Sequence, residues 1–187
     1  LRQDPDVIMV GEIRDTETAD IAIKASLTGE LILSTLHTNS AVGAVTRLRD
    51  MGTEPFLLAS SMVALTAQRL ARTLCPKCKE KYRIDDKLVK TLGIESFCKE
   101  HENVREFYRA KGCPYCNQTG YRGRVALLEI IPLDDTIREM IIEEKPEADI
   151  VAYARRHRWF KSLQEDGLLK CIEGTTTIEE VMRVTAE

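Results

Sequence analysis

The feature that most restricts the fold of this chain is a repeated Cys-Pro-x-Cys motif, at residues 75–78 and again at residues 113–116. A gap of two residues allows both thiolates of a pair to bind one ion. Two such pairs supply the four sulfur ligands of a closed tetrahedral zinc site. We therefore predict a structural Zn²⁺ with no open coordination position, and its ligands are Cys75, Cys78, Cys113 and Cys116.

The other cysteines and the spacing qualify this prediction. Residues 79–112 separate the two pairs, which is longer than in a simple zinc ribbon, so short helices are expected there. Unrelated buried cysteines or redox pairs are the alternatives, and Cys98 with His101 forms a second possible ligand pair without the proline. Cys171 lies in a predicted helix and is expected to be a small core residue.

The first 74 residues alternate between apolar runs and helical patterns. The runs at residues 7–10 and 31–36 are typical of strands buried on both faces of a parallel sheet. Helices are expected between a cap at residue 16 or 18 and Gly29, and at residues 41–51 and 55–74. We expect Thr16 or Thr18 to cap the first, with Gly29 ending it, and Ser40 to cap the second, with Gly52 closing it. This order predicts an α/β layer with parallel strands.

The composition of the sequence changes at Cys75, where the chain becomes more polar and short elements are expected. A further strand is expected at residues 124–131, stopped by Pro132, and it is followed by amphipathic helices. These helices are expected at residues 135–144, 147–157, 162–172 and 177–185. We therefore divide the chain into residues 1–74, an α/β layer; residues 75–123, a zinc-binding subdomain; and residues 124–187, a strand with a helical C-terminal region.

Charge and hydropathy argue against two classes of protein. The formal net charge is −3, so the chain has no overall positive field to attract nucleic acid. No apolar run reaches the roughly 18 residues that a membrane-spanning helix requires. Six cysteines with four in tight pairs suit a reducing compartment.

Two polar residues stand just beyond the predicted parallel strands. Glu12 follows the first strand and His37 follows the second, so both are expected at the edge where ligands gather in open α/β sheets. Considered alone, each residue can be explained by a structural role without any function in catalysis. A glutamate there usually solvates a strand end, and a histidine usually bonds to the backbone of its turn.

Considered together, the segments around these residues resemble a known family. Their order and spacing are similar to the Walker B and His boxes of the ATPases that drive type II secretion and type IV pilus assembly. The matching segments are residues 1–6 (LRQDPD), 11–15 (GEIRD), 28–31 (TGEL) and 34–39 (STLHTN), followed by residues 68–72, 120–124, 166–167 and 175–181. The four-cysteine insert resembles that of the secretion and pilus-extension branch.

The resemblance implies a role for each matching residue. Glu12 would be the Walker B acid that orders Mg²⁺ or its water, and His37 would sense the γ-phosphate of ATP. Arg14 belongs to the same box, and either a salt bridge at a subunit interface or a nucleotide contact would suit it. Arg69 and Arg124 would serve the structure or the interface.

The resemblance also implies an assembly. The fold would be a partial RecA-like P-loop NTPase core with a zinc-binding insert and a helical C-terminal region. The complete protein would bind ATP and Mg²⁺ and form a homo-hexamer. It would be cytoplasmic and peripheral to the inner membrane through a platform protein, and it would couple hydrolysis to pilin or pseudopilin polymerisation.

One expected part is not in the sequence. No Gly-x-x-x-x-Gly-Lys-Ser/Thr loop occurs in the 187 residues, although such a loop is the main source of nucleotide affinity in this class. The resemblance places that Walker A loop upstream of Leu1, so we read the chain as a fragment. We expect the fragment alone to be inactive.

The alternative function is a zinc-stabilised interaction or nucleic-acid-binding module. Zinc ribbons often bind nucleic acid, and residues 77–83 contain a local cluster of lysines and arginine. Six acidic residues balance that cluster: Asp85, Asp86, Glu95, Glu100, Glu102 and Glu106. We therefore expect no nucleic acid as a partner, and the zinc region remains a candidate docking element within the motor.

Overall fold

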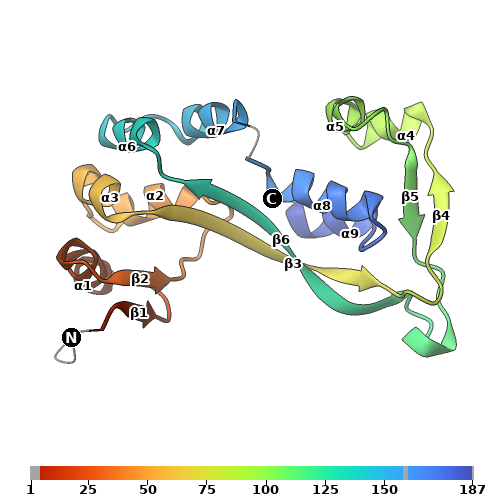
Figure 1. Cartoon of the computed structure of the whole chain (residues 1–187), viewed down its shortest axis with the longest axis horizontal. Coiled ribbons are helices and arrows are strands. Elements are labelled where there is room, and N and C mark those ends of the chain that lie inside the picture. The colour runs from red at the N-terminus through yellow and green to blue at the C-terminus, as the bar shows by residue number, and fades with distance from the viewer. Residues whose placement is uncertain (1–4, 158–159, 187) are drawn as a thin grey trace. The chain divides into compact units, whose positions relative to one another are not determined.

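The computed structural model describes residues 5–157 and 160–186. The chain folds into two compact units, each with more contacts within itself than with the other. Unit 1 comprises Leu1–Ala67 and Ile130–Phe160, and unit 2 comprises Gln68–Glu129 and Lys161–Glu187. The elements can be followed in Figure 1. In chain order they are β1 (Val7–Val10), α1 (Thr16–Thr28), β2 (Leu31–Ser34), α2 (Gly43–Asp50), α3 (Pro55–Ser61), β3 (Ala64–Leu74), β4 (Glu80–Arg83), α4 (Asp86–Thr91), α5 (Glu95–Glu100), β5 (Glu106–Arg109), the 3₁₀ turn η1 (Pro114–Cys116), β6 (Tyr121–Pro132), α6 (Asp135–Ile142), α7 (Glu147–Arg155), α8 (Leu163–Ile172) and α9 (Ile178–Thr185).

Unit 1 begins with the predicted parallel strand pair. β1 and β2 are parallel, and their register runs from Val7 opposite Leu31 to Val10 opposite Ser34. Helix α1 connects them and buries one face made of small and aliphatic residues, Ala19, Ala22, Ile23 and Ala25. This arrangement confirms the strand, helix and strand order and sets the carboxyl ends of both strands side by side.

The cap of α1 is a correction to the sequence prediction. Asp15, not Thr16 or Thr18, is the N-cap, and its carboxylate accepts a hydrogen bond of 2.8 Å from the Thr18 backbone N–H. Gly29 ends the helix in the left-handed conformation at φ 116°, as expected for a glycine after a helix. The cap is therefore the residue directly before the helix, where an acidic group also favours the N-terminal dipole.

The prediction that these strands are buried on both faces is wrong. Val7 and Met9 are 54% and 79% exposed, and Leu31 and Leu33 are each 47% exposed. In the part of the chain that the structure describes, β1 and β2 pair only with each other. β1 therefore alternates between exposed and partly covered residues, and in β2 only Ile32 is partly covered, although both strands are mostly apolar.

The helices that follow β2 are shorter than predicted. α2 begins at Gly43 with Val42 as its N-cap, and the Ser40 hydroxyl instead accepts a hydrogen bond of 3.0 Å from the Gly43 N–H within the preceding turn. The helix predicted at residues 55–74 ends at Ser61, and β3 occupies the rest of that range. The Ala- and Leu-rich sequence favours a helix, but pairing of β3 with β6 outweighs this propensity.

Helices α6 and α7 complete unit 1. The predicted β6 strand is longer than expected and is followed directly by these helices, and the Leu133 N–H donates a 2.9 Å hydrogen bond to the Val63 carbonyl. The Arg138 guanidinium donates to the Ala59 carbonyl near the end of α3. The Tyr153 hydroxyl donates to the Asp134 carboxylate that caps α6, at 2.9 Å. Polar contacts thus join α6 and α7 to each other and α6 to α3.

Unit 2 contains the expected short elements between the cysteine pairs. β4 and β5 form an antiparallel pair with Tyr82 opposite Phe107, and the Phe107 side chain is fully buried. α4 and α5 lie between these strands in the sequence, which confirms the prediction of small helices there. Helices α8 and α9 pack closely, because a Cβ added to Gly167 would lie 2.6 Å from the Val181 Cγ1.

The C-terminal helices agree with the predicted ranges to within two residues at each end. The three-part division of the chain at residues 74 and 123 stays a prediction. Within the described residues, no helix has the length and hydropathy needed to cross a bilayer.

Candidate functional site

The parallel strand pair brings Glu12 and His37 to one edge. Glu12 lies two residues beyond β1, and His37 lies three residues beyond β2. Hydrogen bonds continue past the strand ends, from the Ile13 N–H to the Thr35 carbonyl at 3.0 Å and from the Thr35 hydroxyl to the Gly11 carbonyl at 2.8 Å. These bonds hold the two loops together, so both polar residues face the same rim.

The distance between the two side chains agrees with the predicted juxtaposition. The His37 Nε2 atom lies 3.0 Å from the Glu12 Oε1 atom. Arg14 also pairs with Glu12, through Nε toward Oε1 and Nη2 toward Oε2. A carboxylate, an imidazole and a guanidinium therefore share one edge of the sheet.

Electrostatics keep the Glu12 side chain ionised. The hydrogen bond from Arg14 holds the pKa of Glu12 below its usual range, partial desolvation opposes this, and the charges of Arg14 and His37 add to the lowering. In return, Glu12 raises the pKa of Arg14. The Glu12 Oε1 atom is itself buried and makes no hydrogen bond of good geometry with the described residues. This oxygen instead lies in ion-pair contact with the Arg14 Nε atom and with the His37 Nε2 atom.

The other predicted arginines differ from Arg14. Arg69 lies half-buried on β3 and donates to the Gln68 carbonyl at 3.3 Å, and Arg124 is exposed on β6. Both residues belong to unit 2 and not to the rim of Glu12 and His37. In the first matching segment, residues 1–4 lie outside the described residues.

The structure gathers the four predicted metal ligands into one cluster. The Sγ atoms of Cys75, Cys78, Cys113 and Cys116 all lie within 4.8 Å of one another. The distances from Cys75 to Cys113, Cys78 to Cys116 and Cys113 to Cys116 are 3.9, 3.8 and 3.8 Å. Four sulfurs at about 2.3 Å from a tetrahedral ion would lie about 3.8 Å apart. The cluster therefore has the donor set and the spacing of a tetrathiolate metal site.

The backbone of the second Cys-Pro-x-Cys knuckle prepares one of these sulfurs, that of Cys116, to be a ligand, whereas burial raises the pKa of Cys78 in the first knuckle to about 12. Cys116 Sγ accepts hydrogen bonds from the N–H groups of Cys113 and Gly120, at 3.3 and 3.2 Å. Burial opposes the thiolate form, but these two N–H groups bring the pKa of Cys116 down to about 6. The Gly120 carbonyl accepts from the Cys75 N–H at 2.9 Å, so this glycine joins the two knuckles through its main chain.

The alternative ligands do not join the cluster. Cys98 is fully buried in α5, and the His101 ring lies 4.4 Å from the Phe97 ring, measured between centroids. Among the described residues, the ligand group contains the four knuckle cysteines and neither of these two. Cys171 is fully buried in α8, which confirms it as a core residue.

Sequence reasoning missed a second carboxylate cluster, in unit 2. The Glu180 side chain has no exposed surface and receives ion pairs from Arg72 at 2.8 Å and from Arg183 at 2.6 Å. The hydrogen bonds from Arg183 outweigh desolvation and, with those from Arg72, lower the pKa of Glu180 to about 2. Two local signals exist: Thr177 three residues before Glu180, a capping-box pattern, and Arg183 three residues after it. Neither indicates that the carboxylate also bonds to Arg72, on a strand 108 residues away.

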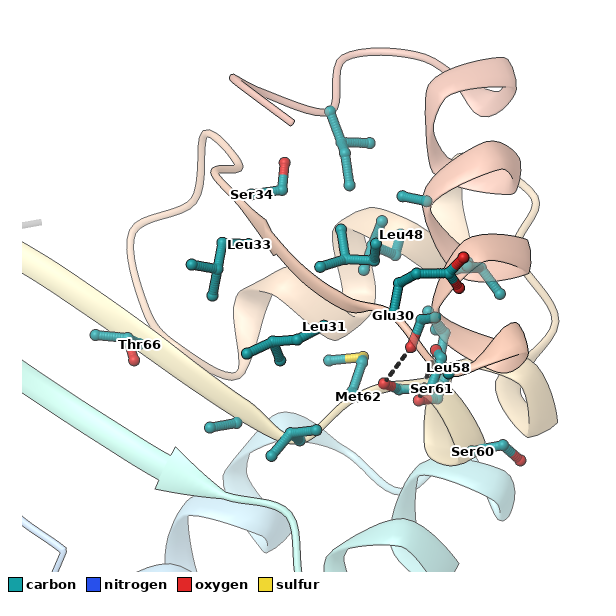
Figure 2. Close-up of a pocket in the computed structure, with 18 residues that line it drawn as sticks. Glu30, Leu31, Leu33, Ser34, Leu48, Leu58, Ser60, Ser61, Met62 and Thr66 are labelled. Atoms are coloured by element: carbon teal, nitrogen blue, oxygen red, sulfur yellow. Dashed lines mark hydrogen bonds between the residues drawn. The ribbon is translucent and has the colours of Figure 1, made fainter. Parts of the chain in front are cut away.

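Unit 1 also contains a cavity of about 700 Å³ beside β2, shown in Figure 2. Apolar side chains such as Leu31, Leu33 and Met62 line it, and Ser26 donates to the Ser61 carbonyl at 3.0 Å in its wall. Glu30 is the one titratable residue in its lining, and it accepts a hydrogen bond from Thr28. The cavity includes neither Glu12 nor His37, so it is not the site of the predicted phosphate chemistry.

The fold and this edge define a class of α/β protein that is known from solved structures. The pilus retraction motor PilT with bound ADP aligns with a TM-score of 0.65 and 23% identity, covering all of this chain and 41% of that one. The Legionella pneumophila ATPase DotB aligns with a TM-score of 0.60 and 20% identity, covering 97% of this chain and 39% of that one. These likenesses confirm the predicted fold class.

The sequence then gives the family. Residues 1–183 match the family described as Type II/IV secretion system protein, and the chain belongs to it. Over all 187 residues the chain is 54% identical to the Type II secretion system protein E of Pseudomonas aeruginosa and to the Type II secretion system ATPase E of Vibrio cholerae. It is 46% identical to the Type IV pilus assembly ATPase PilB of Thermus thermophilus. The chain spans 36%, 36% and 21% of the length of these three relatives.

Proposed function

We propose that this chain is the C-terminal part of a hexameric ATPase that powers type II protein secretion or type IV pilus assembly. The complete enzyme would couple ATP hydrolysis to the polymerisation of pilin or pseudopilin subunits. The observation that carries the proposal is the 3.0 Å approach of His37 Nε2 to Glu12 Oε1 at the carboxyl edge of parallel strands. Membership of the secretion family and relatives named as ATPases support it.

The proposed chemistry divides between three side chains. Glu12, which is ionised, would hold Mg²⁺ or order its water, and the ion would supply charge neutralisation at the phosphates. His37, with a side chain that is 84% exposed, is free to turn and donate a hydrogen bond to a terminal phosphate. Arg14 is a positioning residue that fixes the rotamer of Glu12.

The test of this assignment uses the complete enzyme. Glu12→Gln keeps the size of the side chain and removes its charge, and we expect ATP hydrolysis to fall by at least about 100-fold. His37→Ala should lower the rate as well, whereas Glu17→Gln on the first turn of α1 should not. Full activity of Glu12→Gln would refute the role of this carboxylate.

The 187 residues alone should neither bind ATP tightly nor hydrolyse it, because they contain no Gly-rich lysine loop to cradle the phosphates. Isothermal titration with Mg-ATP tests this directly. A dissociation constant below about 10 μM, close to −7 kcal/mol, would contradict the proposal.

We further propose that the tetracysteine cluster holds one structural Zn²⁺. Four thiolates at tetrahedral spacing fill the coordination shell of the ion, so no position remains for substrate. Metal analysis of the purified chain should give one zinc ion per chain. Persistent binding of a different metal, or none after expression with added zinc, would overturn this assignment.

The location and partner follow from the same family. We propose that the complete protein lies in the cytoplasm and contacts a platform protein of the inner membrane. A pull-down of the platform protein with and without residues 73–120 tests whether the tetracysteine region contributes. Undiminished capture by the deletion variant would exclude such a contribution.

A further inference from the structure

The knuckle that carries Cys113 and Cys116 presents a tyrosine flanked by two cations. Tyr115 is 41% exposed and lies between these two cysteines. The Lys77 Nζ atom lies 4.0 Å from the centre of the Tyr115 ring, and the Arg122 Cζ atom lies 4.3 Å from it. The three side chains come from both cysteine pairs and from the start of β6, all within unit 2.

Lys77 and Arg122 differ from the basic residues on and just after the antiparallel strands β4 and β5. Lys81 pairs with Glu106, and Arg109 and Lys111 both pair with Glu80. Among the described residues, no carboxylate lies within 4.0 Å of the charged nitrogens of Lys77 or Arg122. Two positive charges are therefore held beside one exposed ring without an anion to offset them.

The knuckle also fixes the position of this group. Tyr115 belongs to the 3₁₀ turn η1, with Pro114 before it, and the Arg122 guanidinium donates a 3.0 Å hydrogen bond to the Tyr115 carbonyl. A rigid aromatic side chain between fixed charges loses little conformational freedom when a ligand binds. Exposed tyrosine and arginine are also the residue types that protein interfaces favour.

We propose that Lys77, Tyr115 and Arg122 form a docking surface for a carboxylate-rich segment of a partner protein. The guanidinium of Arg122 matches a carboxylate in two parallel hydrogen bonds, and Lys77 adds a second positive charge nearby. The Tyr115 ring and hydroxyl supply apolar contact and a hydrogen bond. This role is independent of nucleotide hydrolysis.

Two other anionic partners fit the surface less well. Nucleic acid requires a track of phosphate contacts, but this surface offers two charges in a chain whose net charge is −3. Anionic membranes attract clusters of about four to eight basic residues. A short acidic peptide needs only the two cations that are present.

The experiment is an NMR titration of the metal-loaded 187-residue chain, labelled with ¹⁵N. The probe is an acetylated and amidated decapeptide of alternating Glu and Ser. A ten-residue oligothymidine and phosphatidylglycerol vesicles are titrated separately, to test whether a phosphate-bearing partner binds the surface instead. We expect the peptide to shift the amides around residues 77, 115 and 122, with an affinity that falls as salt is added.

Variants then locate the binding. Arg122→Glu and Lys77→Glu should each weaken peptide binding by at least about tenfold, and Tyr115→Leu should weaken it less. Lys87→Glu, an exposed lysine of α4, is the matched control and should change the affinity by less than about twofold. Unchanged metal content and unchanged amide spectra outside the surface show that each variant is folded.

Three outcomes would overturn the proposal. The first is no peptide-induced shift around these residues. The second is equal binding by Arg122→Glu, Lys77→Glu and the Lys87→Glu control. The third is tighter binding of the oligothymidine or the vesicles than of the peptide, with that binding lost in Arg122→Glu, which would assign the surface to a phosphate-bearing partner instead.

Discussion

Glu12 in unit 1 and Glu180 in unit 2 have similar partners and different surroundings. Each carboxylate pairs with positively charged side chains, and each has a pKa below its usual range. The Glu12 side chain is 28% exposed, whereas that of Glu180 is fully buried. Both Glu180 oxygens accept hydrogen bonds of good geometry from Arg72 and Arg183, whereas Glu12 Oε1 makes ion-pair contacts with Arg14 and His37.

The difference teaches how to separate a structural carboxylate from a functional one. Glu180 has its acceptor capacity filled by the protein, so its removal would leave two arginines without their counterion. Glu12 is partly exposed, and its partners Arg14 and His37 are exposed, so its contacts can be exchanged for contacts with a ligand. A buried carboxylate with saturated hydrogen bonds indicates stability, whereas a partly exposed carboxylate with exposed partners at a strand end indicates chemistry.

The largest expected effect on folding stability concerns the tetracysteine cluster, which is structural in the same sense as Glu180. Cys113→Ser should cost at least about 3 kcal/mol of folding stability in unit 2, because metal binding and folding are coupled when the ligands form a closed shell. Calorimetry together with metal analysis measures this loss. Cys98→Ala, in the same unit and outside the cluster, should keep one metal ion per chain. Equal metal loss in both variants would contradict the assignment of ligands.

Glu180→Gln should have the next largest effect. The variant keeps the shape of the side chain and removes the charge that pairs with Arg72 and Arg183, which are themselves half-exposed. We expect a loss of about 2 kcal/mol in the free energy of unfolding, measured by urea denaturation. Glu179→Gln, an exposed neighbour, is the control. A loss no larger than that of the control would show that burial does not separate the two kinds of carboxylate.

Acid should reveal the same group in the unaltered chain. The pKa of Glu180 is about 2 in the folded state and about 4.3 in an unfolded chain, so the folded state binds the proton less readily. This contribution is fully present above about pH 4.3 and is lost as the pH falls toward 2. It amounts to about 2 kcal/mol once screening around the exposed arginines is included. Unfolding titrations between pH 6 and pH 2.5 should show a smaller acid loss in Glu180→Gln.

The smallest expected effect on stability belongs to Glu12→Gln. Its partners Arg14 and His37 are exposed, so water replaces the lost contact and the melting temperature should stay within error. A thermal melt of the chain, with Glu17→Gln beside it, checks this. A drop as large as that of Glu180→Gln would mean that Glu12 is structural.

Much of this architecture could be predicted from local sequence. The spacing within each Cys-Pro-x-Cys motif predicted that the four cysteines form one cluster, because each pair is close in the chain. The positions of Glu12 and His37 just beyond two parallel strands predicted that they lie together. The C-terminal helices followed from their periodicity. The roles of these residues stay predictions.

The failures came from distant contacts. Residues 64–74 have a helix-favouring composition, and only pairing with β6 makes them a strand. The link from Glu180 to Arg72 crosses 108 residues, and no local pattern encodes it. The open faces of β1 and β2 likewise depend on which strands are present beside them, not on their own apolar sequence.

Gly120 joins the two knuckles with its peptide groups alone, at φ 77°, and an added Cβ would lie 2.5 Å from that of Ala110. A side chain at this position would clash with Ala110, so the Gly120 backbone would have to shift and its hydrogen bonds to Cys75 and Cys116 would be strained, although all four cysteines remained in the sequence. An inherited change of Gly120 would therefore mimic the loss of a cysteine, and a survey of variants that inspected only the ligands would overlook it.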